Sequence, residues 1–236
     1  MLRKAFEYIV DLATPAIINI GDQTYSSKSL SRISYNPKAA EISMTTLSSL
    51  IDYIKSGVDT MQGKMIIHVK SPTWVSMYSA LDHERKRENV VEVNAKLPEF
   101  AFDRFIDHES FCIALQSKFI PTEDRALLLK FAGTVEAGTV AEYGDDGITQ
   151  KATIKTGIAA KSDAIVPSPV KLKPFRTFIE VNQPWSQFIF RMQGDRNIHC
   201  ALFEADGGAW KLEAMKSIKG YLEEALKDFE NFIIIS

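Results

Sequence analysis

The sequence predicts an α+β protein with mixed, mainly antiparallel sheets, flanking helices and a long amphipathic helix towards the C-terminus. Three observations lead to this class. Apolar residues recur at helical spacing in several segments. Other segments alternate in period two or are rich in β-branched residues. Two pairs of such segments flank turn sequences that are typical of antiparallel hairpins.

The first two helices are predicted from their apolar stripes. Residues 2–13 carry apolar side chains at helical spacing. A second stripe predicts a helix over about 47–58, with Ser43 or Thr45 as its N-cap and Gly57 near its end.

The following segments predict strands and then helices again. Runs rich in β-branched and aromatic residues at 65–69, 74–81 and 90–95 indicate an antiparallel meander. Helical spacing returns from Phe102 onwards, so two helices are expected between about 103 and 131.

Two hairpins are predicted in the second half of the chain. Residues 134–143 and 148–158 flank an Asp-Asp-Gly turn, and alternation in the second strand predicts one solvent-exposed face. The proline-rich segment 165–174 favours an extended, edge-like path. Residues 187–193 and 199–205 flank a second turn, and both are apolar enough to be central strands.

The last predicted helix has the strongest apolar stripe, which runs from Trp210 to Phe232 with charged residues on the opposite side. We expect one α+β domain over residues 1–236, with an irregular segment at 14–42. A two-lobed layout divided near 160–175 is the alternative.

Composition limits the classes of function. The 236 residues are 45% hydrophobic and 25% charged, as in ordinary soluble globular proteins, and the net charge of −2 excludes a highly basic coat for duplex DNA. Cys112 and Cys200 have apolar neighbours and no metal-like spacing, which predicts reduced core residues. Glu7 and Asp11 interrupt the first apolar run, and no run approaches the roughly 18 residues of a membrane span. We therefore expect a cytoplasmic protein without a membrane partner.

A search for catalytic chemistry finds no convergent set of groups. The acids beside His83 have closer basic partners, and His108 lacks a second histidine at metalloprotease spacing. His68 and His199 lie in apolar strands, where histidines are usually satisfied core residues. No nucleophile elbow, phosphate loop or dinucleotide motif occurs, and neither cysteine has an adjacent histidine or asparagine. The sequence predicts no catalytic residue, no metal and no cofactor, and it favours a non-enzymatic protein.

One candidate binding segment is basic and aromatic. Between residues 151 and 196, eight basic residues face three acids, and aromatic residues are interleaved with them. Cations beside stacking surfaces are what single-stranded nucleic acid requires, although strands also bury such aromatics for packing alone. The candidate residues are Lys171, Lys173, Arg176, Trp185 and Arg191.

A second candidate lies at the end of a predicted strand. Glu204 and Asp206 precede two glycines and a helix, which is a common shape for a ligand site. The alternative is a turn in which Asp206 caps the helix and the glycines adopt positive φ angles.

A series of residues between 174 and 210 resembles a known family. It comprises Pro174-Phe-Arg-Thr-Phe178, Glu180-Val181, Gln183-Pro184, Ser186, Phe188-Ile-Phe-Arg191 and Leu202-Phe-Glu-Ala-Asp-Gly-Gly-Ala-Trp210. With these residues the chain resembles the YfdQ-like family of phage and prophage proteins, a domain of unknown function, from about Ile51 through the C-terminal helix. The resemblance implies a viral or prophage origin and the cytoplasm of a bacterial host cell. It implies no reaction and no site residues.

The C-terminal tail predicts self-association. On a helix, Ile233, Ile234 and Ile235 point about 100° apart, so a single stripe cannot bury them all. As a short strand they could join a sheet edge in this chain or in a neighbouring one. We expect a homo-oligomer with residues 229–236 in or beside the interface, and the alternative is a tail buried in its own subunit. The candidate interface residues are Phe229, Phe232, Ile233, Ile234 and Ile235.

Three functions follow, in this order. The first is a non-enzymatic phage accessory protein that self-assembles and binds a host or phage partner. The second is a single-stranded nucleic-acid-binding protein in phage replication or recombination. The third is a small-molecule binder or enzyme that uses the turn at Glu204 and Asp206.

Overall fold

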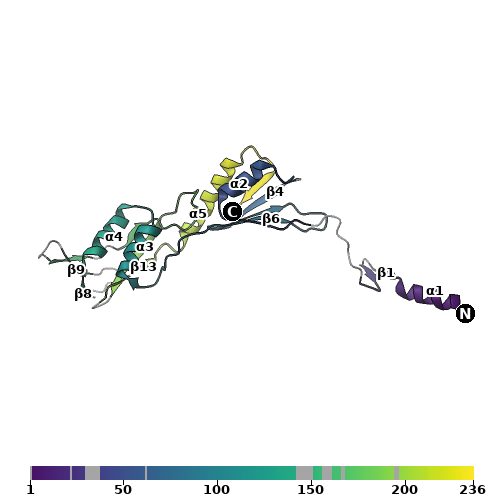
Figure 1. Ribbon diagram of the computed structural model, residues 1–236, viewed down its shortest axis with the longest axis horizontal. Helices are drawn as coiled ribbons and strands as arrows, with labels where there is room; N and C mark the ends of the chain where they lie inside the picture. The colour runs from purple at the N-terminus through teal and green to yellow at the C-terminus, as the bar shows by residue number, and fades with distance from the viewer. Residues whose placement is uncertain are drawn as a thin grey trace. The chain divides into compact units, whose positions relative to one another are not determined.

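The computed structural model describes residues 2–21, 23–29, 38–61, 63–141, 151–155, 161–165, 168–193 and 197–236. Helices alternate with strands that pair mainly antiparallel, which confirms the predicted α+β class (Figure 1). The chain divides into two compact units, Met1–Ala39 and Ala40–Ser236. The boundary falls within the segment 14–42 that the sequence predicts to be irregular.

Among its described residues, the first unit contains one helix and one two-stranded sheet. Helix α1 (Leu2–Ala13) has the bounds that its stripe predicts. The strands β1 (Ile17–Ile20) and β2 (Gln23–Ser26) pair antiparallel, which the prediction of an irregular segment missed. The apolar side chains of Phe6 and Ile18 are exposed.

The second unit begins with a five-stranded sheet in the order β14-β4-β5-β6-β3. Strands β4 (Met65–Ser71), β5 (Trp74–Ser79) and β6 (Asn89–Asn94) form the predicted antiparallel meander. Both edges are parallel additions, β3 (Ile42–Met44) beside β6 and β14 (Phe232–Ile235) beside β4.

Helices α2 (Leu47–Ser56) and α5 (Ala209–Ala225) lie on the same side of this sheet (Figure 1). Their apolar stripes and the inward residues of the strands form one core. The N-cap of α2 is Thr46, whose side chain accepts a hydrogen bond from the backbone N of Ser49, so the predicted cap at Ser43 or Thr45 is wrong. Gly57 ends the helix at a φ of +60°, a conformation that glycine adopts without steric cost.

The C-terminal helix is shorter than its stripe predicts. Helix α5 ends at Ala225, so Phe229 lies beyond it and Phe232 begins β14. The consecutive isoleucines that follow are β-branched and pair with β4, where alternate side chains reach the core. Strand pairing therefore replaces the last turns of the predicted helix.

A second sheet has the order β11-β12-β13-β7. Strands β12 (Ser186–Gln193) and β13 (His199–Glu204) form the predicted central hairpin. Strand β11 (Val170–Leu172), which lies within the proline-rich segment, forms one edge, and β7 (Ile106–Asp107) forms the other. Ile106 therefore lies on a strand instead of the helix that its spacing suggests.

The two predicted helices between 103 and 131 are α3 (His108–Lys118) and α4 (Glu123–Thr134). They pack on the second sheet through a phenylalanine-rich core. Three further strands, β8 (Val135–Ala141), β9 (Lys151–Lys155) and β10 (Lys161–Ile165), form an antiparallel sheet that contains the predicted hairpin. Its predicted turn lies outside the described residues, and so do the side chains that would decide the exposed face.

The segment between β11 and β12 joins the two cores of this unit. Phe178 and Val181 pack in the core of the five-stranded sheet, although the strands on either side belong to the other sheet. The side-chain oxygen of Gln183 accepts from the backbone N atoms of Arg176 and Thr177, and its nitrogen donates to the carbonyls of Thr177 and Phe178. One buried amide thus holds the loop closed.

Candidate functional site

Arg176, one of the predicted nucleic-acid residues, is only 7% exposed. Its guanidinium carbon lies 4.3 Å from the ring centroid of Phe102, 4.6 Å from that of Trp210 and 4.9 Å from that of Phe188. A cation over an aromatic face gains about 0.5–2 kcal/mol, most when it is shielded from water. This arginine therefore belongs to the interior and cannot contribute charge to a nucleic-acid surface.

Carboxylates surround the same guanidinium. Its Nη1 lies 3.0 Å from Oε1 of Glu204, and Asp206 and Asp103 add to the negative field. Burial lowers the pKa of Arg176 below its ordinary value, while the three carboxylates oppose this effect. Asp103 has a φ of +59°, and its Oδ1 accepts from the backbone N of Glu204 at 3.2 Å. This contact fixes the loop that carries Phe102 beside β13.

Several buried polar atoms of this cluster have no hydrogen-bond partner among the described residues. They are Nε and Nη2 of Arg176, Oδ2 of Asp206 and Nε1 of Trp210. A buried donor without an acceptor costs about 1–3 kcal/mol. The cluster is therefore held by packing and one ion pair more than by complete hydrogen bonding.

The sequence allows either a ligand site or a structural turn after β13, and these residues form a structural turn. Oδ1 of Asp206 accepts from the backbone N of Gly208 at 3.0 Å, and Gly207 and Gly208 have φ angles of +61° and +80°. The N-cap of α5 is Gly208 itself, so the prediction that Asp206 caps the helix is wrong. Glu204 and Asp206 are thus both occupied, by Arg176 and by the turn.

Lys171, Lys173 and Trp185 come together at the surface. They line a pocket of about 510 Å³ beside the first turn of α4, to which Glu123 and Asp124 also contribute. Trp185 is 47% exposed, and Nζ of Lys173 lies 5.1 Å from its ring centroid. The indole can stack on a planar group, but the two carboxylates balance the two ammonium charges.

Arg191 does not line this pocket. It lies on β12 opposite Ala201 and is half-buried. The five predicted nucleic-acid residues therefore separate into a surface group of three, a buried arginine and a half-buried strand residue that pairs with β13.

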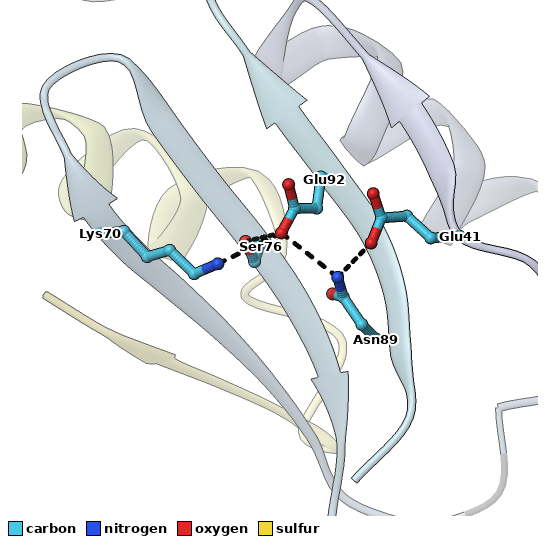
Figure 2. Close-up of polar contacts among 5 residues, drawn as sticks. All are labelled: Glu41, Lys70, Ser76, Asn89 and Glu92. Carbon is cyan, nitrogen blue, oxygen red and sulfur yellow. Dashed lines mark hydrogen bonds and ion pairs between the residues drawn. The ribbon is translucent and has the colours of Figure 1, made fainter.

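A polar network that the sequence did not predict lies on the five-stranded sheet (Figure 2). Oε1 of Glu92 accepts from Nζ of Lys70 at 3.2 Å, from Nδ2 of Asn89 at 3.2 Å and from Oγ of Ser76 at 3.4 Å. Asn89 also donates to Glu41, so the network reaches from β4 to the residue before β3. Polar residues that alternate with buried ones along these strands are the sequence signal that could have revealed it.

The network shifts two pKa values in opposite directions. Burial raises the pKa of Glu92, but hydrogen bonds from Lys70 and Asn89 outweigh it, so the pKa lies below 4.5. Burial lowers the pKa of Lys70, but its hydrogen bonds to Tyr78 and Glu92 outweigh it, so the pKa lies above 10.5. The ammonium also lies 3.8 Å from the ring centroid of Trp74. The arrangement holds a charged pair in place across three strands.

The tail forms a strand at the edge of a sheet. Phe232 and Ile234 pack against the core below the sheet, whereas Ile233 and Ile235 are 42% and 43% exposed. Phe229 packs at the margin of the same core, with its ring centroid 6.3 Å from that of Phe232. The tail is therefore buried in its own subunit along one face only.

His108 and Cys112 form a contact that the sequence search missed, although the spacing of four residues on a helix allows it. Nε2 of His108 lies 3.6 Å from Sγ of Cys112 and 2.7 Å from the carbonyl oxygen of Ala132. Burial raises the pKa of the Cys112 thiol. Reactive cysteines have a lowered pKa, so the direction of this shift does not favour an activated nucleophile.

Within the described part of the chain, no group of three metal-ligating side chains occurs, and no helix is both long and apolar enough to cross a bilayer. Comparison with known proteins gives no relative. No protein-family model, no curated protein and no solved structure matches the chain. The resemblance to the YfdQ-like family therefore stays a prediction from its residues.

Proposed function

We propose that this chain is a non-enzymatic, self-assembling accessory protein of a phage or prophage, with the tail strand β14 at the contact between subunits. One observation carries the proposal: one edge of the five-stranded sheet is the apolar strand Phe232–Ile235, and two of its isoleucines, Ile233 and Ile235, are exposed. The family resemblance supports the phage context and a host or phage protein as the further partner.

Edge strands of monomeric proteins are commonly protected by lysine, proline or a bulge. β14 contains none of these, and its pairing with β4 is regular over all four residues. Burying one isoleucine side chain gains roughly 1.5–3 kcal/mol. A neighbouring subunit that covered Ile233 and Ile235 would gain this energy and satisfy the unpaired backbone groups of the edge.

The test is the molar mass in solution, measured by light scattering. Removing the whole tail would also remove Phe232 and Ile234 from the core, so the double variant Ile233→Lys/Ile235→Lys is the sharper change. Val58→Lys is the matched control, because this valine is 72% exposed and lies at the end of α2.

We expect an oligomeric parent, an oligomeric control and a monomeric double variant with an unchanged circular dichroism spectrum. A monomeric parent would refute self-assembly. A double variant that keeps the mass of the parent would refute the role of the tail.

A second function, binding of single-stranded nucleic acid, is favoured by the pocket around Trp185. An exposed indole beside Lys171 and Lys173 offers a stacking surface worth about 1–3 kcal/mol per base. Because Arg176 is buried and Glu123 and Asp124 share the pocket, we expect weak binding with a shallow salt dependence.

Fluorescence anisotropy with a labelled oligonucleotide at about 50 and 200 mM salt tests this second function. Trp185→Ala should abolish binding, and Trp185→Phe should keep part of it because a ring remains. Absence of binding to the parent at the lower salt concentration eliminates the hypothesis.

A further inference from the structure

A groove runs along helix α3 in the second sheet region, and Phe102, which also contacts Arg176, is one of its lining residues. It has a volume of about 690 Å³, within the range of small-molecule sites. Its floor consists of apolar side chains and its ends carry charges. The lining residues are Glu99, Phe100, Ala101, Phe102, Arg104, Ile106, Ser110, Ala114 and Lys118.

The helix sets the length of the groove. Ser110, Ala114 and Lys118 are four residues apart, so they follow one another along the same face of α3 and span about 12 Å. The small side chain of Ala114 leaves the middle open, and Phe100 and Phe102 face it from the preceding loop. Apolar surface therefore lies between two polar ends.

The two basic residues that line the groove, Lys118 and Arg104, differ in their partners. Nζ of Lys118 donates to the backbone carbonyl of Glu99, and that glutamate brings a negative charge to the same end. Arg104 is exposed and forms no ion pair with any residue whose position the structure gives. The nearby Asp107 carboxylate accepts hydrogen bonds from the backbone N of Ser110, where it caps the helix, and from the Ser110 side chain. Among the described residues that line the groove, Arg104 is thus the cation that has no anionic partner.

From this geometry we propose that the groove binds an amphipathic anion: an apolar or aromatic body of about ten carbon atoms that carries one carboxylate or sulfonate group. The body covers the phenylalanine side chains next to Ala114, and the anionic group pairs with Arg104. This site is independent of self-assembly through β14 and of the pocket around Trp185.

The test compares two fluorescent probes that differ by one charge. Anilinonaphthalene sulfonate is an aromatic anion, and phenylnaphthylamine has the same rings without the sulfonate. Each probe is titrated into the parent protein and into Arg104→Gln, which removes the cation, and Ser110→Tyr, which fills the groove from an exposed position. Lys216→Gln, on the exposed side of α5, is the control for a general loss of positive charge.

Because a hydrogen bond to a charged group is stronger than a neutral one, Arg104→Gln should raise the Kd of the sulfonate about tenfold and leave that of the neutral probe within twofold. Ser110→Tyr should raise the Kd of both probes, and Lys216→Gln should leave both Kd values unchanged. Melting temperatures identify any variant that fails to fold. If either Arg104→Gln or Ser110→Tyr fails to fold, the result of the other one decides whether the groove is the binding site.

Two results would overturn the proposal. If Arg104→Gln binds the sulfonate as the parent does, the groove does not select an anion. If Ser110→Tyr binds both probes as the parent does, the probes bind elsewhere on the protein.

Discussion

Two replacements of Arg176 distinguish how much aromatic packing and how much the ion pair with Glu204 contribute to the stability of the second unit. Arg176→Ala removes contacts with three aromatic rings and leaves a cavity, and it also leaves Glu204 without its cation. Breaking a buried ion pair or emptying a core site costs about 3–5 kcal/mol. Arg176→Met fills most of the same space, and it removes two buried N–H groups that lack partners and cost about 1–3 kcal/mol each.

The environment of the Glu204 carboxylate decides how far the stability losses of Arg176→Met and Arg176→Ala differ. Its side chain is 29% exposed, so water can solvate it once the arginine is gone. We therefore expect Arg176→Met to lower the free energy of unfolding by only about 0–2 kcal/mol, against about 3–5 kcal/mol for Arg176→Ala.

Urea unfolding at one fixed protein concentration, followed by tryptophan fluorescence, measures both values, since Trp210 stacks on the guanidinium. Lys216→Met, on an exposed helix face, controls for the change of charge. If methionine costs as much as alanine, the ion pair with Glu204 and not the aromatic packing stabilises this cluster, and the reasoning is wrong.

Three further predictions concern other parts of the second unit. Because hydrogen bonds lower the pKa of Glu92 in the folded protein, its stabilisation is fully present above the ordinary glutamate pKa and is lost as the pH falls through the lowered one. Glu92→Gln should therefore cost about 1–2 kcal/mol at pH 7 and progressively less on acidification, by urea unfolding at each pH. Gly208→Ala should lower stability by about 1–2 kcal/mol because of its positive φ, whereas Gly220→Ala, inside α5 with open space around it, should raise the melting temperature through a gain of about 0.5–1 kcal/mol. Gln183→Ala should cost about 2–4 kcal/mol in the same unfolding assay, since it leaves several buried backbone groups without partners.

Each of these predictions has its own contrary result. A pH-independent cost for Glu92→Gln would show that the lowered pKa does not contribute to stability. Equal effects at Gly208 and Gly220 would show that backbone conformation does not decide them. A mild effect of Gln183→Ala would mean that the loop reorganises around the missing amide.

Much of the fold could be predicted because it depends on neighbours in the sequence. The meander of β4, β5 and β6 and the hairpin of β12 and β13 each connect adjacent segments, and their alternating patterns identify the buried faces. The edge strands β3, β7 and β14 are short, and their partners are distant in the chain. A run of two to four residues has no period of its own, so tertiary pairing alone defines it.

The residue types of the candidate site could be predicted from the sequence. Their separation into a surface group and a buried arginine could not. Lys171, Lys173 and Trp185 are close in sequence and meet in one pocket. Arg176 lies among the same basic residues, yet it is buried because Phe102 and Trp210 come to it from distant segments. Nothing local distinguishes an arginine that faces water from one enclosed by aromatic rings.

The parallel pairing of β4 with β14 has a consequence for the order of events during synthesis. The meander leaves the ribosome early. Helix α5, which covers its apolar face, begins about 115 residues after β6 ends, and β14, which completes its edge, begins about 140 residues after it. At about 5–20 residues per second this delay is on the order of 6–30 s. Until Phe178 and Val181 emerge, α2 is the helix that covers the inward residues Ile67, Val75 and Met77. Until these later segments emerge, the apolar face of the meander is open to premature contacts with other chains.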